Sequence, residues 1–185
     1  MTGVQTCALP IFHRLLALAL LVAAPAAAST FIALTPEELV RDAEAVVEGR
    51  IVEVSSFWNA EHTAILTEAT LEVEDAVVGA APAFVTLRTF GGRVGNLVIE
   101  AHGFPRFALG ERLLVFLEPE RDGAHRVLGY LQGQYRIRTD PAGKAIAEPL
   151  ADFGARLLRR DGTEAPAPKA LPLVEHRQED RKSVV

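Results

Sequence analysis

The side chains that could ligate a metal are spread widely along this chain of 185 residues. Its five histidines are His13, His62, His102, His125 and His176. No two of them have the His-x-x-x-His or His-x-His spacing that presents both imidazoles on one helix face or strand. Only the converging loops of a curled sheet would bring His62, His102 and His125 together. We therefore predict no metal site and keep a metal-dependent hydrolase built on these histidines as an alternative function.

Residues suited to covalent or acid–base catalysis form no recognisable arrangement. No serine between residues 12 and 179 lies in the Gly-x-Ser-x-Gly turn of a nucleophile elbow. Glu68, Glu72 and Glu74 alternate with apolar residues, which is typical of the water-facing side of a strand. A glycosidase needs one carboxyl in an environment that raises its pKa, and nothing in this pattern singles one out. We predict a protein without catalytic residues and without a cofactor.

Aromatic and arginine side chains are better candidates, because such residues dominate recognition surfaces. They occur in the stretches Phe57-Trp58, Gly91-Gly92-Arg93-Val94-Gly95 and Phe104-Pro105-Arg106-Phe107. An apolar extended segment follows the glycines, so they lack the helix N-terminus of a phosphate-binding loop and indicate a hairpin or rim loop. The alternative for the aromatic stretches is packing of loops onto the end of the barrel. The predicted ligand or partner surface consists of Phe57, Trp58, Arg93, Phe104, Arg106 and Phe107.

One helix and a series of short strands must position these stretches. Thr35 is a good N-cap, Pro36 suits the first turn and Glu38 completes a Thr-x-x-Glu capping box. We therefore expect a helix over residues 36–45. Odd-numbered residues in 65–73 are mostly apolar, whereas Glu68, Thr70, Glu72 and Glu74 share the other face, which predicts a half-buried strand. Further strands are expected near residues 46–57, 85–89, 97–99, 113–117, 125–131, 134–139 and 145–147.

The strand at residues 113–117, Leu-Leu-Val-Phe-Leu, is apolar on both faces, so it should be central and covered on both sides. About seven short strands after one helix describe a mainly β domain, an antiparallel barrel or sandwich. The glycines at positions 49, 129 and 133 suit sharp bends in a strongly curled sheet. We place this β-barrel domain at residues 29–150, and a linker with a truncated tail at residues 151–179.

The two ends of the chain resemble translated sequencing adapters rather than native protein. The codons that fit residues 8–11 are the reverse complements of those that fit residues 180–183, as expected for inverted adapters. We therefore exclude residues 1–11 and 180–185 from fold reasoning. This exclusion removes Cys7, the single cysteine, so no disulfide or cysteine-ligated metal is expected.

Residues 12–28 have the pattern of a secretory signal peptide. His13-Arg14 precedes a short apolar run, and an Ala26-x-Ala28 pattern suits cleavage before Ser29. The run is too short to cross a bilayer core of about 30 Å, so we expect no stable membrane anchor. The expected location is the periplasm or the outside of the cell.

The formal net charge of −5 argues against a nucleic-acid partner, because such partners usually require a basic face. An acidic exported domain without a convergent polar site is better suited to a protein or peptide partner than to a small molecule. This argument leaves the identity of the partner and the oligomeric state open.

Three segments resemble a family of exported bacterial proteins of unassigned function. They are residues 39–54 (LVRDAEAVVEGRIVEV), 104–117 (FPRFALGERLLVFL) and 129–137 (GYLQGQYRI), within a similarity that spans residues 35–148. The resemblance implies a barrel similar to the oligonucleotide/oligosaccharide-binding (OB) fold and, more loosely, to netrin and tissue metalloproteinase-inhibitor modules. Those inhibitors engage zinc through an N-terminal cysteine, whereas Ser29 begins the expected mature chain, so no inhibitory residue is carried over.

The sequence thus predicts an antiparallel OB-like barrel preceded by one helix. Its expected function is that of an exported, non-catalytic binding module for a protein or peptide. The alternatives are an accessory or inhibitor of an exported metalloprotease, the metal-dependent hydrolase described above, and a purely structural envelope component.

Overall fold

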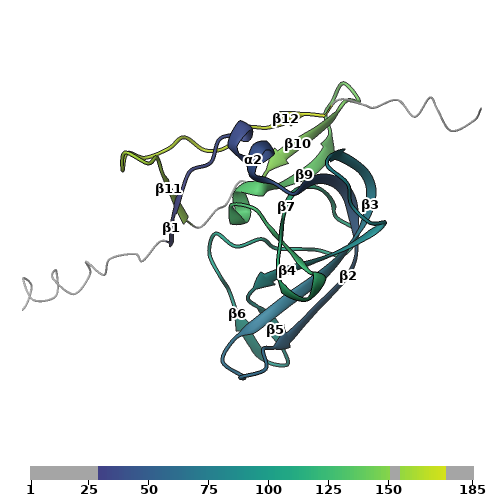
Figure 1. Ribbon diagram of the computed structural model, residues 1–185, viewed down its shortest axis with the longest axis vertical. Helices are drawn as coiled ribbons and strands as arrows, with labels where there is room; N and C mark the ends of the chain where they lie inside the picture. The colour runs from purple at the N-terminus through teal and green to yellow at the C-terminus, as the bar shows by residue number, and fades with distance from the viewer. Residues whose placement is uncertain (1–28, 151–154, 174–185) are drawn as a thin grey trace, which may run out of the picture.

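The computed structural model describes residues 29–150 and 155–173 (Figure 1). The predicted signal peptide and both adapter segments lie outside these residues. Within them, no helix has the length and apolar character needed to cross a membrane. The helical elements are α2 (Pro36–Asp42) and the 3-10 turns η1 (Arg121–Gly123) and η2 (Tyr130–Gly133). The strands are β1 (Ser29–Ile32), β2 (Ala45–Trp58), β3 (Ile65–Val78), β4 (Phe84–Phe90), β5 (Gly92–Val94), β6 (Leu97–Ile99), β7 (Arg112–Pro119), β8 (His125–Val127), β9 (Gln134–Thr139), β10 (Ala145–Pro149), β11 (Ala155–Leu158) and β12 (Leu171–Pro172).

Five strands close a barrel, which confirms the mainly β fold. Their order is β7-β2-β3-β4-β8, and β8 pairs again with β7 to close the ring. The barrel is mixed rather than antiparallel throughout, because β4 and β8 pair in parallel at Leu87 and His125. The reason is topological: antiparallel alternation around a closed ring of five strands must fail at one neighbouring pair. Figure 1 shows the barrel below α2, with the β5–β6 hairpin at its lower end.

The same sheet continues beyond the barrel and forms a second layer. Strands β9, β10 and β12 follow β7 in the sheet, and α2 lies beside them (Figure 1). The sequence expectation of a linker after residue 150 did not include β11 and β12. Strand β11 pairs in parallel with β1, and β12 pairs with β10. Backbone pairing therefore holds both ends of the segment between β11 and β12, which is rich in proline and alanine.

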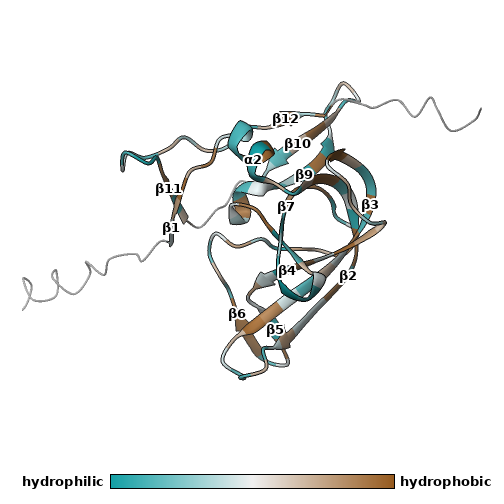
Figure 2. Cartoon of the chain, in the orientation of Figure 1, coloured by the Kyte–Doolittle hydropathy of each residue, from teal (hydrophilic) through white to brown (hydrophobic). Residues whose placement is uncertain are grey.

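Strand β7 separates two hydrophobic cores, as its apolar sequence predicts. Leu113, Val115 and Leu117 point into the barrel core. Leu114 and Phe116 point into a second core beneath α2. Figure 2 shows hydrophobic residues, in brown, on strands of both the barrel and the outer layer. Burial of both faces of one strand joins the barrel and the outer layer into a single folded unit.

The predicted alternation of β3 is confirmed. Ile65, Thr67, Ala69 and Leu71 are buried, whereas Glu72 on the opposite face is exposed. The two strands β2 and β3 are strongly coiled, with three register shifts along their pairing. Gly49 lies at one shift, and a Cβ at this position would collide with the backbone carbonyl of Glu72. The bend predicted at this glycine therefore depends on the absence of a side chain.

Two element boundaries differ from the sequence expectation. The capping box at Thr35 and Glu38 is present, but α2 ends at Asp42, because Ala43 is extended and Glu44 donates its backbone N–H to the Leu117 carbonyl. The expected strand over residues 125–131 ends at Val127. The chain then turns through η2, because Gly129 and Tyr130 both adopt positive φ angles.

We predict that Leu71 and Glu72 respond very differently to truncation. Leu71→Ala should lower the free energy of unfolding by about 2–5 kcal/mol, because it leaves a cavity in the barrel core. Glu72→Ala should change it by less than about 0.5 kcal/mol, because the side chain faces water. Urea denaturation followed by circular dichroism measures both values. Equal effects at the two positions would contradict the described orientation of β3.

Candidate functional site

The barrel is weakest where β4 and β8 meet, and we call this place the β4–β8 seam. The two strands share one residue pair, Leu87 with His125. Beyond that pair they diverge around a pocket of about 220 Å³. The pocket is lined by Leu66, Arg88, Thr89, Phe90, Phe104, Pro105, Glu120, Arg126, Val127 and Tyr130. The seam is therefore a break in the barrel wall, and residues from the neighbouring loops line the pocket within it.

The edge of β4 at the seam carries backbone groups that the ladder does not use. The Gly91 N–H donates to the Ile65 carbonyl (2.9 Å), which fixes the bonding register between β3 and β4. In this register the Arg88 carbonyl and the Phe90 N–H point away from β3. Within the described part of the chain, the β4–β8 ladder ends before it reaches them. They form a short sheet edge of the kind that accepts an extended peptide.

Aromatic rings line the seam. The Phe104 ring centroid lies 5.8 Å from that of Phe90 and 4.9 Å from that of Tyr130. Phe31 from β1 packs behind them, 4.9 Å from Tyr130. These separations lie in the favourable range for aromatic pairs. Phe90 and Tyr130 remain 40% and 41% exposed, so the cluster still offers a large apolar surface to a partner.

The backbone of Tyr130 is strained. Its φ angle is 59°, in the left-handed region that residues with a side chain adopt at a cost of about 1–2 kcal/mol. Neighbouring contacts hold the turn in place: the Leu131 N–H donates to the Gly103 carbonyl, and the Gln132 amide donates to the carbonyls of Ile32 and Gly129. In this conformation the ring of Tyr130 packs against that of Phe104.

Two arginines line the seam pocket with the rings, and three carboxylates pair with them. Arg88 donates two hydrogen bonds to Glu68 (2.9 and 2.7 Å), and its guanidinium also lies 3.9 Å from Glu120. Arg126 donates to Glu118 (2.6 Å). The hydrogen bond to Glu68 raises the pKa of Arg88, and the bond to Glu118 raises the pKa of Arg126, so both stay charged. With their partners counted, these five side chains include one more carboxylate than guanidinium group, and Glu120 is the carboxylate that lines the pocket itself.

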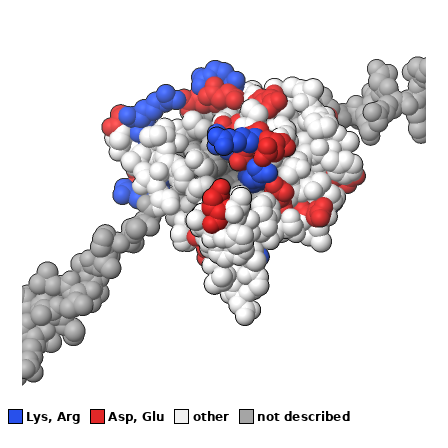
Figure 3. Space-filling view, turned by 60° about the horizontal axis from the view of Figure 1, so that its bottom comes forward, with Lys and Arg blue, Asp and Glu red and all other residues white. Residues whose placement is uncertain are grey.

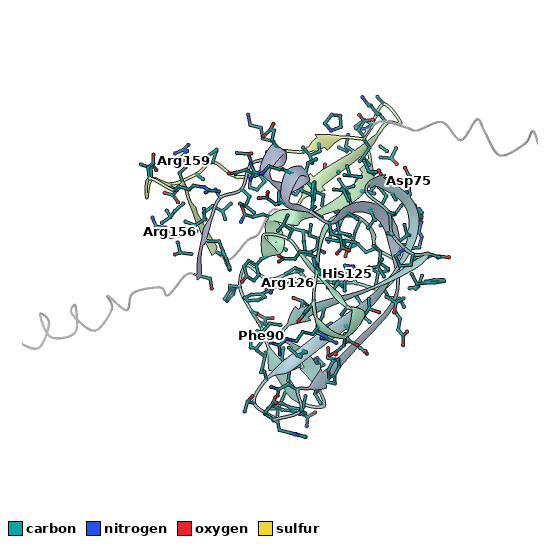
Figure 4. The ribbon with its side chains drawn as sticks, in the orientation of Figure 1. Asp75, Phe90, His125, Arg126, Arg156 and Arg159 are labelled. Carbon is teal, nitrogen blue, oxygen red and sulfur yellow. The ribbon has the colours of Figure 1, made fainter. Side chains whose placement is uncertain are left out.

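The labelled side chains place this site in the fold. Figure 4 shows Phe90 from β4 and Arg126 from β8 on the barrel wall. They lie well away from Arg156 on β11 and from Arg159, which directly follows β11. Lys/Arg and Asp/Glu side chains lie intermingled near the middle of the face shown in Figure 3. This face therefore carries mixed charge rather than a field of one sign.

The structure separates the six residues of the predicted surface into three groups. Phe104 lies in the seam. Arg93, Arg106 and Phe107 line a neighbouring pocket of about 280 Å³, which shares Thr89, Phe90 and Pro105 with the seam. Phe107 also packs against the barrel core, as the packing alternative for the aromatic residues expects. The β5–β6 hairpin, formed by the glycine stretch, covers part of this second pocket.

Phe57 and Trp58 belong to the third group, at the far end of β2. Both are half-buried, and the Trp58 ring stacks on His62 with 6.3 Å between centroids. His125 lies instead at the β4–β8 pair, with its Nε2 atom 3.6 Å from Glu44. Among the described residues, no group of three or more His, Cys, Asp or Glu side chains is placed to hold a metal.

Sequence reasoning missed Phe90, Tyr130, Arg88 and Arg126. Phe90 carried a usable signal, because even-numbered residues of the 85–89 strand face outward and an outward aromatic residue is unusual. Tyr130 carried none, since nothing in the sequence indicates a left-handed tyrosine after a glycine. Gln134 was also missed: it is fully buried and clamps the backbone of Arg106 through both amide atoms.

We predict that Tyr130→Gly is more stable than Tyr130→Ala by about 1 kcal/mol. Both changes remove the ring and its contacts, but only glycine adopts the positive φ without strain. Urea titrations give the free energy of unfolding of each variant. The difference between the two values measures the cost of the positive φ angle at residue 130. An alanine variant as stable as the glycine variant would mean that position 130 is not held in the left-handed region.

Comparison with known proteins gives no match to the chain among protein-family models, curated proteins or solved structures. A function must therefore be argued from the geometry of its own residues.

Proposed function

We propose that this protein is an exported, non-catalytic binding module with an OB-like barrel, and that it binds an extended peptide segment of a protein partner at the β4–β8 seam. The observation that carries the proposal is the combination, at one place, of an unpaired strand edge and exposed aromatic rings. Backbone groups supply affinity in such a site, and pockets for side chains supply specificity.

The strand order supports the OB-like assignment. Numbered from β2 onward within the barrel, the strands follow the order 1-2-3-5-4, and the parallel pair joins the third and fifth strands. OB folds bind ligands on the face of their second and third strands, between the loops that follow the first and fourth strands. The corresponding elements here are β3, β4 and the segments 59–64 and 120–124. Glu120, at the start of the latter segment, lines the seam.

The chemistry of the seam restricts the peptide. Phe90, Phe104 and Tyr130 favour an apolar or aromatic side chain as the anchor. The excess of carboxylates favours a lysine or arginine on the same face as that anchor, with Glu120, which lines the pocket, as its partner. Side chains two residues apart lie on the same face of an extended chain, so the preferred ligand is an extended segment with a basic residue two positions from an aromatic one.

The alternatives have less support. A metal-dependent hydrolase would require His62, His102 and His125 to converge, but Trp58 stacks on His62 while His125 lies near Glu44. No observation on the described residues favours a metalloprotease inhibitor over a general peptide-binding module.

We predict that a random peptide library displayed on phage will yield binders with an aromatic residue two positions from a lysine or arginine. Phe90→Ala should weaken a selected peptide at least tenfold, because truncation of a central aromatic anchor typically costs about 2 kcal/mol. Glu120→Gln should weaken it about threefold, because it removes a partly exposed charge. Isothermal titration calorimetry with synthetic peptides measures both effects.

Phe84→Ala is the matched control. Phe84 lies on the same strand and is 58% exposed, but it does not line the seam pocket. Its truncation should leave the affinity unchanged. The proposal fails if no peptide is enriched, or if the selected peptides bind the Phe90→Ala variant as tightly as the unmodified chain.

A further inference from the structure

A third cavity lies between the start of α2 and the segment of residues 159–169. Its volume is about 660 Å³, within the range of about 300–1,000 Å³ that is common for small-molecule sites. Leu34, Pro36, Ala165, Pro166, Ala167 and Pro168 give it a largely apolar wall. It shares no lining residue with the seam.

The walls of this cavity are held in place before any ligand binds. Arg160 donates a hydrogen bond to Glu38 (3.0 Å), and this bond connects the segment of residues 159–169 to α2. The Ala165 N–H donates to the Leu157 carbonyl (2.8 Å), and Leu171 pairs with Ala147 in the sheet. Prolines at positions 166 and 168 fix φ between these two anchors. A preformed wall lowers the ordering cost of binding.

Tyr135 brings a polar group to this apolar wall. Its side chain lines the cavity and is only 2% exposed. Within the described residues, its hydroxyl takes part in no side-chain hydrogen bond, and it is not among the fully buried polar atoms that lack a partner. Burial raises the pKa of Tyr135, so the hydroxyl keeps its proton and remains a donor at neutral pH. The group is therefore available to donate to an acceptor in the cavity.

The charges at the cavity wall favour an anionic ligand. Glu38 is paired with Arg160, and Asp161 accepts hydrogen bonds from the backbone and hydroxyl of Thr163. Arg159 donates to Thr163 and to the Glu164 carbonyl. Lys169 also lines the cavity, and among the described residues it forms no ion pair. The charge of Lys169 is therefore not neutralised by these neighbours and attracts a negatively charged ligand.

We propose that this cavity binds a single molecule of an amphiphilic carboxylate, such as a medium-chain fatty acid. The apolar tail contacts the proline and alanine wall, the carboxylate accepts a hydrogen bond from the Tyr135 hydroxyl, and Lys169 attracts the head group. This site is independent of the peptide-binding function proposed above.

Calorimetric titration of the purified chain with sodium decanoate tests the proposal. Decanol and decyltrimethylammonium bromide, titrated in parallel below their micellar concentrations, carry the same tail with a neutral and a cationic head. Decanoate should bind at least fivefold more tightly than either. Tyr135→Phe should weaken decanoate about tenfold, the loss typical of a hydrogen bond to a charged group, and Lys169→Gln about threefold.

Two further variants test the location of the site. Ala167→Trp should abolish binding by filling the cavity, whereas Ala170→Trp, in the same exposed segment but outside the lining, should not change it. Thermal melts establish that each variant is folded. The proposal is overturned if decanoate does not bind at millimolar concentration, if the three head groups bind equally, or if the folded Ala167→Trp variant binds decanoate unchanged.

Discussion

Two strands, β8 and β9, pair with different parts of the same edge of β7, and the arrangement of the barrel and the outer layer depends on this division. Residues 117–119 pair with β8, whereas residues 113–115 pair with β9. Both faces of β7 are buried, so the strand cannot shift to accommodate either neighbour. The chain between β8 and β9 must therefore leave the barrel wall through η2. This departure limits β8 to three residues and opens the seam beside β4.

Buried glutamines compensate for the strand pairing that this departure removes. Gln134 donates to the Arg106 carbonyl (2.7 Å) and accepts from the Arg106 N–H (3.2 Å). Gln132 accepts from the Leu34 N–H (2.9 Å) and donates to the Ile32 carbonyl (3.0 Å). A primary amide presents one donor and one acceptor side by side, as a strand backbone does. The two side chains thus fix the loop before β7 and the segment before α2, which support the seam and the cavity respectively.

The sequence predicted the features that depend on local pattern. The alternation around Leu71, the capping box at Thr35 and the double burial of residues 113–117 all follow from side-chain spacing within one element. The parallel closure, the short β8 and the turn at Tyr130 depend on contacts between distant segments, which no local window contains. The aromatic cluster was missed in part for this reason: its rings come from β1, β4, η2 and the loop before β7. Phe104 alone was predicted.

The seam combines features that a barrel selected only for stability would avoid. A continuous β8 would have paired the free edge of β4, and glycine at position 130 would have removed the backbone strain. Tyr130 instead adopts the strained conformation and places its ring beside Phe104, next to the part of the β4 edge that has no strand partner among the described residues. Packing alone does not account for a strained backbone beside exposed aromatic rings, whereas the proposed ligand accounts for both. Because both faces of β7 are buried, the core fixes this opening, and a peptide bound there as proposed would require little ordering of the protein.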